Sequence, residues 1–232
     1  MAIKVSNISK SYGKQEVLQS LNFEVQPGEI VGFLGINGAG KSTCMKIITG
    51  WLTPDNGSVT ICGHDIQQDT IAAKHEMGYL PENNPLYPEM YVREYLRYVA
   101  GLYRTPDAKA RIDEVIRQIK LEEVEDKLIS TLSKGYRQRV GLAQALVHNP
   151  EVLILDEPFS GLDPNQLNEI HKLIKELGKT KAILFSSHSL SEATQLCDRV
   201  LILHNGQLVA NAALSELTRE QSLEDLFKEL TR

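Results

Sequence analysis

A glycine-rich segment near the N-terminus has the residue types and spacing of a phosphate-binding loop. Residues 35–42 read Gly-Ile-Asn-Gly-Ala-Gly-Lys-Ser, which fits GxxxxGK followed by Ser or Thr. Glycines at these spacings let backbone N–H groups fold around phosphate oxygens. A lysine can then reach the β- and γ-phosphates, and the next hydroxyl can bind Mg²⁺. The segment therefore predicts a site for a magnesium-bound nucleotide.

The residues of this loop have separate expected roles. Lys41 is the point charge for the phosphates, and the Ser42 hydroxyl is the Mg²⁺ ligand, with Thr43 as its alternate. A strand pattern at 30–34 precedes the loop and a helical pattern follows it, which argues against a glycine-rich turn that binds nothing. The expected nucleotide contacts in the loop are Gly35, Asn37, Gly38, Ala39, Gly40, Lys41, Ser42 and Thr43.

Two adjacent acids follow a second apolar strand pattern. Residues 152–155 are Val-Leu-Ile-Leu, and Asp156 and Glu157 come directly after them. Carboxylates at a buried strand end are costly unless a cation or hydrogen bonds compensate them. Asp156 is the expected ligand in the Mg²⁺ shell, and Glu157 is positioned to polarise an attacking water. A solvated turn is the alternative, and the upstream phosphate loop argues against it.

The elements that must position these residues alternate between strand and helix patterns. The expected strands are 3–8, 17–25, 29–34, 58–61, 77–80, 152–155, 182–186, 200–203 and 207–210. The expected helices are 41–50, 91–103, 109–120, 133–148, 164–177 and 190–197, with two short helices at the end. Alternation of this kind predicts a parallel α/β core, and the early β segments predict an antiparallel sheet beside it.

The region from about 85 to 132 has a different pattern. Apolar and tyrosine residues recur there at helical spacing, which predicts a helical lobe. The tyrosine stripe between Tyr91 and Tyr103 is interpreted as core packing and not as a ligand site.

Composition narrows the class of protein. Hydrophobic residues make up 42% of the 232 residues and the net charge is −5, which fits a folded chain and disfavours nucleic acid as a partner. The three cysteines, Cys44, Cys62 and Cys197, are isolated, which favours reduced thiols over a metal site. No apolar run is long enough to cross a bilayer and the N-terminus lacks a signal sequence, so a cytoplasmic location is expected.

Further motifs resemble the ABC ATPase family. Residues 132–139, Leu-Ser-Lys-Gly-Tyr-Arg-Gln-Arg, resemble its LSGGQ signature, and residues 160–163, Ser-Gly-Leu-Asp, match the segment after its Walker B acids. His188 resembles its switch histidine, and Tyr12 resembles the aromatic residue that stacks on adenine. The resemblance covers essentially the whole chain. It implies a P-loop NTPase core with a mostly parallel sheet, an N-terminal antiparallel β subdomain and a helical lobe that contains the signature.

The resemblance implies one domain over residues 1–232 that binds and hydrolyses ATP with Mg²⁺. Its helical lobe would span about 85–150 and a helical tail 211–232. Two copies, or this chain and a paralogue, would close head to tail around two ATP molecules. Ser133 and Gly135 would contact the γ-phosphate bound by the partner, and Asp163 would organise the seam. Within the chain, Tyr12 and Val17 would contact the nucleotide, and Lys41, Glu157 and His188 would act in catalysis.

Three residues depart from the family pattern. Lys134 stands where LSGGQ has one of its two Gly residues, and Tyr136 stands where it has Gln. The other Gly is retained as Gly135. Glu82 stands where the family often has a Gln that touches Mg²⁺. A carboxylate can also bind magnesium. The hypothesis is that Glu82 is a metal ligand and couples the metal site to the helical lobe, with an exposed loop acid as the alternative.

Two segments resemble the ATP-binding subunits of ABC-2-type exporters, including the gliding-motility-associated group: residues 79–87 and 222–227. The resemblance implies a motor subunit that acts on a separate transmembrane permease, bound to the inner face of the plasma membrane through it. The alternatives are a soluble ABC ATPase that acts on ribosomes or DNA, and a small-molecule kinase with the same phosphate loop. The first usually has two ATPase domains or a coiled-coil insertion, and the second leaves the signature unexplained.

Overall fold

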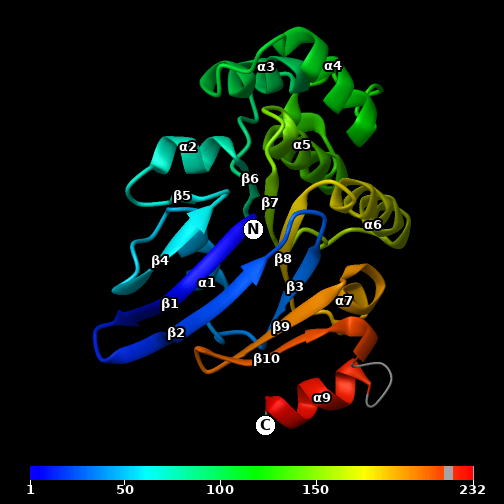
Figure 1. The fold of residues 1–232 in the computed structure, drawn as a ribbon. Helices are drawn as coiled ribbons and strands as arrows, with labels where there is room; N and C mark the ends of the chain where they lie inside the picture. Colours follow the sequence, from blue (N-terminus) through cyan, green and yellow to red (C-terminus); the bar gives the residue numbers. More distant parts are fainter. Residues whose placement is uncertain (217–221, 232) are drawn as a thin grey trace.

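The structure, a computed structural model, describes residues 1–216 and 222–231. Two β-sheets and the helices that pack around them make up this part of the chain (Figure 1). The four-stranded sheet has the order β2-β1-β4-β5, with β1 Ile3–Tyr12, β2 Gln15–Val25, β4 Asn56–Ile61 and β5 His64–Asp65. The six-stranded sheet has the order β10-β9-β3-β8-β7-β6. Its strands are β3 Ile30–Leu34, β6 Met77–Leu80, β7 Val152–Asp156, β8 Ala182–Ser187, β9 Arg199–His204 and β10 Gln207–Ala213.

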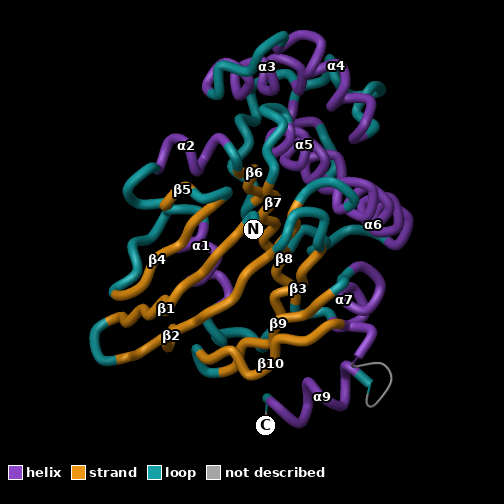
Figure 2. Tube along the Cα trace, in the orientation of Figure 1, coloured by secondary structure: helices purple, strands orange, loops and turns teal. Residues whose placement is uncertain are grey.

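The larger sheet is parallel except for its edge strand β10, which pairs antiparallel with β9. Its five parallel strands are mostly buried on both faces, which explains their continuous apolar runs. In β7, Val152 and Ile154 belong to the core shared with the four-stranded sheet, while Leu153 and Leu155 belong to the core under the helices. This alternation follows from the two-residue period of a strand. The four-stranded sheet covers one face and most helices cover the other (Figure 2).

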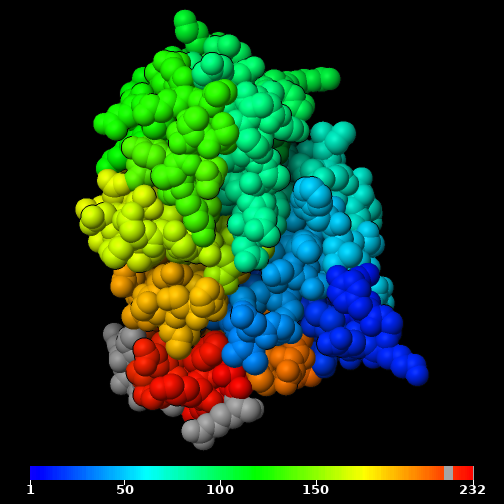
Figure 3. All heavy atoms as spheres, turned by 180° about the vertical axis from the view of Figure 1, so that it is seen from behind, coloured from blue at the N-terminus to red at the C-terminus, as the bar shows by residue number. Residues whose placement is uncertain are grey.

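The helices are α1 Lys41–Ile48, α2 Thr70–His75, α3 Val92–Leu102, α4 Ala108–Ile119, α5 Lys134–Leu146, α6 Pro164–Gly178, α7 Leu190–Leu196 and α9 Leu223–Leu230, with a 3-10 turn η1 at Ile129–Thr131. Helices α3 and α4 form a lobe above the parallel sheet, and α5 connects this lobe to the sheet (Figure 1). The lobe and the C-terminal helix α9 lie at opposite ends of the molecule (Figure 3).

The predicted mixed α/β architecture is confirmed, with small differences in its elements. Sequence patterns missed β5 and α2, which are only two and six residues long and carry little periodicity. Strand β10 continues to Ala213, so the tail starts later than the predicted residue 211. Part of that predicted helical tail, residues 217–221 and 232, lies outside the described residues.

The interpretation of the tyrosine stripe as core packing is only partly right. Tyr95 is buried under α3, whereas Tyr91 and Tyr98 are 50% and 43% exposed. Tyr98 and Tyr87 meet edge to face, with ring centroids 5.8 Å apart. A helix of 3.6 residues per turn cannot bury every residue of so wide a stripe against a single neighbouring surface.

Candidate functional site

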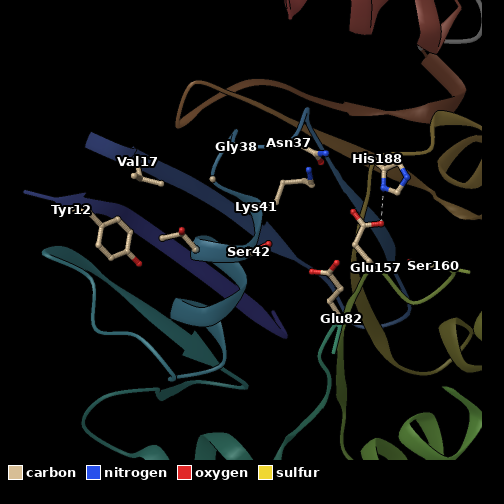
Figure 4. Close-up of a pocket in the computed structure, with 12 residues that line it drawn as sticks. Tyr12, Val17, Asn37, Gly38, Lys41, Ser42, Glu82, Glu157, Ser160 and His188 are labelled. Carbon is tan, nitrogen blue, oxygen red and sulfur yellow. Dashed lines mark hydrogen bonds and ion pairs between the residues drawn. The ribbon is translucent and has the colours of Figure 1, made fainter. Parts of the chain in front are cut away.

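A cleft of about 410 Å³ opens where the parallel strands β3, β6, β7 and β8 end. Ligands in open α/β sheets bind at this carboxyl edge. The structure brings eleven of the predicted site residues to this cleft: Tyr12, Val17, Asn37, Gly38, Gly40, Lys41, Ser42, Thr43, Glu82, Glu157 and His188. Tyr12 and Val17 lie at one end, Glu157 and His188 at the other, and Lys41 between them (Figure 4).

The glycine loop between β3 and α1 is shaped by close packing. Gly40 has φ +110, and a Cβ on it would lie 2.9 Å from the carbonyl oxygen of Val17. Only glycine fits both the backbone conformation and the space. Gly40 is followed at once by the first turn of α1, so the free N–H groups of that turn face the loop. The local structure is therefore an anion-binding helix start.

Lys41 is folded back over its own loop. Its Nζ donates hydrogen bonds to the carbonyl oxygens of Gly35 at 2.6 Å and Ile36 at 3.2 Å, and the side chain is buried. Burial lowers the pKa of Lys41, and the nearby carboxylates of Glu157, Asp156 and Glu82 act in the opposite direction. A phosphate in the cleft would supply a further negative charge to this ammonium, which favours its charged form.

Asp156 and Glu157 share one serine as a partner. Ser186 Oγ donates to Asp156 Oδ1 at 2.5 Å and accepts from the backbone N–H of Glu157 at 3.0 Å. Glu157 has φ +49, a left-handed conformation that is uncommon outside glycine, and such conformations cluster at functional sites. The Ser186 contact helps hold that conformation, so β8 positions both acids of β7.

Glu157 and His188 form a pair in the cleft. Glu157 Oε2 lies 2.9 Å from His188 Nδ1, drawn as a dashed line in Figure 4. Hydrogen bonds of the preceding residue, Ser187, hold the turn that carries His188. Ser187 Oγ donates to Glu192 Oε2 at 2.5 Å and accepts from the Ser189 backbone N–H at 2.9 Å. An imidazole in this position can donate from its other nitrogen to an anion in the cleft.

The acids of the cleft have shifted pKa values. Burial raises the pKa of Glu157, against the opposing effect of His188 and Lys41. Burial also raises the pKa of Asp156, and the negative charge of Glu82 raises it further. Shifts of this kind indicate carboxylates that lack full charge compensation, as expected where a cationic ligand binds.

The donor set at this edge fits a magnesium ion bound together with phosphate. Asp156 is buried, and within the part of the chain that the structure describes a hydrogen-bond partner is found only for its Oδ1; Ser42 and Glu82 line the cleft. Among the described residues, no three His, Cys, Asp or Glu side chains converge as a metal cage. Mg²⁺ typically needs only one or two carboxylates, with substrate phosphates and waters completing its shell.

Six predicted residues lie outside the lining of the cleft. Gly35 and Ala39 are buried parts of the loop backbone, and Asp156 lies beneath the cleft. Ser133 and Gly135, which the resemblance assigns to the partner's nucleotide, and Asp163, which it assigns to the dimer seam, are likewise absent from this lining. The structure therefore does not bring the signature residues together with Lys41 within one chain.

Ser133, Gly135 and Asp163 instead lie at the starts of the helices α5 and α6, which pack against each other. Ser133 caps α5 by accepting from the Tyr136 N–H at 3.4 Å, and Asp163 caps α6 by accepting from the N–H groups of Asn165 and Gln166 at 3.0 Å. A Cβ on Gly135 would lie 2.4 Å from the Gln166 side chain. The two helix starts are thus packed as a unit.

The departures from LSGGQ are accommodated differently. Tyr136 is partly buried against the core, and the guanidinium of Arg139 lies 5.7 Å from its ring centroid. Lys134 is exposed and its ammonium packs against Gly161. The Tyr136 side chain therefore contributes to packing in the core, while Lys134 lies exposed at the start of α5.

Sequence reasoning missed two residues of this edge. Ser160 lines the cleft, and Ser186 holds Asp156 and Glu157. The only signal for Ser186 was a polar residue at the end of an apolar strand pattern. Its role could not be read from the chain because it depends on β8 lying beside β7.

The sequence is similar to known transport proteins. A family model described as ABC transporter matches residues 18–160. The linearmycin resistance ATP-binding protein of Bacillus subtilis (strain 168) is 36% identical over 218 residues, covering 93% of this chain and 70% of the relative. The Nod factor export ATP-binding protein I of Paraburkholderia xenovorans (strain LB400) is 37% identical over 220 residues, covering 93% of this chain and 72% of the relative.

Solved structures agree with the fold. An ATP-binding subunit of an ABC transporter has a TM-score of 0.92 at 34% identity, with 100% of both chains covered. A dimeric ATP-binding cassette in a post-hydrolysis state, bound to ADP and Pi, has a TM-score of 0.82 at 26% identity, covering 91% of this chain and 98% of the other.

Proposed function

Because this chain belongs to the ABC transporter family of ATP-binding domains, we propose that it is the motor subunit of an exporter of the ABC-2 type. The whole chain would act as one ATPase domain, bound to the inner face of the plasma membrane through a separate permease. No helix among the described residues is long and apolar enough to cross a bilayer. The names of the relatives, which concern linearmycin resistance and Nod factor export, support the direction of transport.

One observation carries the proposal: the same chain has a cleft suited to ATP and a signature segment that does not line this cleft. Lys41 and Glu157 line the cleft, whereas Ser133, Gly135 and Asp163 do not. This division is expected if each site is completed by a second copy, arranged head to tail. The free N–H groups at the start of α5 and the Ser133 hydroxyl form a suitable anion contact for the partner's γ-phosphate.

The cleft residues provide the groups for ATP hydrolysis. Lys41 and the loop N–H groups bind the phosphates, and Tyr12 and Val17 lie where the base and sugar would rest. Glu157 would accept a hydrogen bond from the attacking water, and water oxygen bonds to the γ-phosphorus as the bond to ADP breaks. His188 would donate to the γ-phosphate while Glu157 holds its other nitrogen. Bound Mg²⁺ would offset phosphate charge, with Ser42, Asp156 and Glu82 as its protein ligands or outer partners.

Glu82 provides a test of the metal assignment. We expect Glu82→Ala to raise the Mg²⁺ concentration needed for half-maximal ATPase activity roughly 10-fold, because the cleft loses a carboxylate that favours a divalent cation. The measurement is ATPase rate against free Mg²⁺ at fixed ATP. Glu89→Ala, which removes an exposed acid seven residues later, is the control and should match wild type. Equal Mg²⁺ requirements in both variants would contradict the role of Glu82.

A second hollow, of about 450 Å³, provides a surface for the permease. It lies between α1 and the lobe, and it is bordered by Trp51, which is 75% exposed, and by Tyr103. Lys46 and Lys74 also line it, so an amphipathic permease segment with an acidic side chain would fit. This hollow, called the groove below, has the chemistry of a docking site.

The groove and the ATP cleft share one segment of chain. Pro81 and Asn83 line the groove, and Glu82 between them lines the cleft. A shift of this segment on nucleotide binding would therefore also move Pro81 and Asn83 and change the shape of the groove. This shared backbone is the proposed route by which ATP-driven dimer closure acts on the permease.

Co-purification of a transmembrane partner tests the function. We expect the wild-type chain to bring down a polytopic membrane protein, and Trp51→Ser to reduce its recovery about 30-fold, since exposed tryptophans at interfaces are frequent hot spots. Ile71→Ser is the matched control, because Ile71 is 79% exposed and does not line the groove. ATP binding by each variant checks its fold. Recovery of ribosomes or DNA in place of a membrane protein would overturn the proposal.

A further inference from the structure

A single side chain bridges the Glu82 segment and the signature helix. Asn84 Nδ2 donates to the carbonyl oxygen of Arg137 at 3.1 Å, across 53 residues of sequence. Arg137 lies in the first turns of α5, and its own N–H donates to the carbonyl oxygen of Ser133 at 3.0 Å. Asn84 therefore joins the segment that enters the ATP cleft to a helix start that does not line it.

The contact depends on a glycine inside α5. A Cβ on Gly141 would lie 1.9 Å from Asn84 Nδ2, so any side chain there would displace the amide. Glycine in a helix interior costs about 1 kcal/mol relative to alanine. The sequence keeps this unfavourable residue at the one place where the Asn84 amide enters the helix surface.

The side-chain amide of Asn84 carries a second energetic cost. The Oδ1 atom of Asn84 is buried and finds no hydrogen-bond partner among residues 1–216 and 222–231. A buried acceptor without a partner costs about 1–3 kcal/mol. An apolar side chain at 84 would remove this cost, so stability alone does not explain the asparagine. Gly141 has a second reason, because a Cβ there would also lie 2.6 Å from Leu80 Cδ1.

The neighbouring residue of α5 makes a comparable connection to the catalytic acids. Gln138 is buried, and its Nε2 donates to the carbonyl oxygen of Pro158 at 3.0 Å, one residue beyond Glu157. Adjacent residues of the signature helix are thus bonded to the two segments that carry Glu82 and Glu157. These two hydrogen bonds hold the start of α5 in a fixed position relative to the Glu82 segment and the Glu157 segment.

We propose that Asn84 is a positioning residue that sets the Ser133 end of α5 relative to the Glu82 side of the ATP cleft. In the head-to-tail dimer, on which this inference rests, Ser133 would contact the partner's nucleotide. Asn84 would then link occupancy of one cleft to the contact made with the other. A side chain that only stabilised the lobe would affect unfolding but not this contact.

The test measures dimerisation in a chain that cannot consume its ATP. Each variant carries Glu157→Gln, and sedimentation gives the dimer dissociation constant with saturating MgATP. We expect Asn84→Asp, which keeps the shape but replaces the donor with a repelling oxygen, to weaken the dimer roughly 10-fold. Asn84→Ala, which cannot repel Arg137, should weaken it in the same direction. ATP affinity of the monomer at low protein concentration should change less than about twofold.

Asn56→Asp is the matched control. Asn56 is exposed at the start of β4, and no hydrogen bond of its side chain is found among the described residues, so the same change in charge should leave the dimer unaltered. If Asn84→Asp and Asn84→Ala dimerise as the parent does, the inference on Asn84 fails while the dimer stands. If both lose monomer ATP affinity as well, Asn84 acts on its own cleft and the inference also fails. A parent that never dimerises with ATP would remove the proposed head-to-tail arrangement itself.

Discussion

The Glu157→Gln chain is expected to bind MgATP and to hydrolyse it about 10²–10⁴ times more slowly than wild type. In the wild-type chain, His188 Nδ1 lies 2.9 Å from Glu157 Oε2. Glutamine has the same size as glutamate and can still form a hydrogen bond with His188. It cannot take a proton from water. The affinity for ATP should be unchanged or higher, because one negative charge near the phosphates is removed. Single-turnover hydrolysis and equilibrium ATP binding measure the two effects separately.

The same variant should accumulate as an ATP-bound dimer, because hydrolysis would normally reopen it. Glu176→Gln is the control, since Glu176 is an exposed acid of α6 that pairs with Lys179 far from the cleft chemistry. That control should hydrolyse ATP at the wild-type rate. Normal turnover by Glu157→Gln would assign the general base to another residue.

The pH profile of the wild-type chain checks the same assignment. Burial raises the pKa of Glu157 above its ordinary value of 4.5, and a general base acts only when ionised. Activity should therefore be lost as pH falls through a pKa above 4.5, at a higher pH than an exposed glutamate would require. The acid limb due to this group should be missing from the residual activity of Glu157→Gln.

Lys41→Met is expected to lower the affinity for MgATP by roughly 100-fold or more. Removing one partner of a buried charge pair costs about 2–5 kcal/mol, because the other charge is left unpaired. Lys41 is a cation that interacts with the carboxylates of Glu157, Asp156 and Glu82, so its loss leaves these negative charges less compensated near the bound phosphates. Methionine is apolar and similar in length, which limits the effect on packing.

Calorimetric titration with MgATP measures this loss, and thermal unfolding without nucleotide checks the fold. Lys4→Met is the matched control, because Lys4 is exposed on β1, pairs with Glu24 of the neighbouring strand β2 at 3.7 Å, and does not line the cleft. It should bind ATP as wild type does. If Lys41→Met retained full affinity in a well-folded chain, the phosphate-loop assignment would be wrong.

The sequence by itself determined the local features of this protein. The glycine loop, its lysine and the strand before it are encoded within residues 30–42, and the structure has a left-handed Gly40 at the start of α1 as the motif requires. The caps at Ser133 and Asp163 are also local, since each accepts from an N–H two or three residues later. Such features depend on neighbours in the chain, so residue type and spacing are enough to predict them.

Only the tertiary structure decided which distant residues meet. The strand order β3-β8-β7 places Ser186 between the phosphate loop and the two acids, and no pattern in β8 predicts this. It also separates Ser133 from the Lys41 cleft of the same chain and seats Asn84 against Gly141. Apolar periodicity tells which face of an element is buried but not which element covers it. That choice is made when side chains from remote segments pack together, and here it determines where the acids, the signature and the Asn84 contact lie.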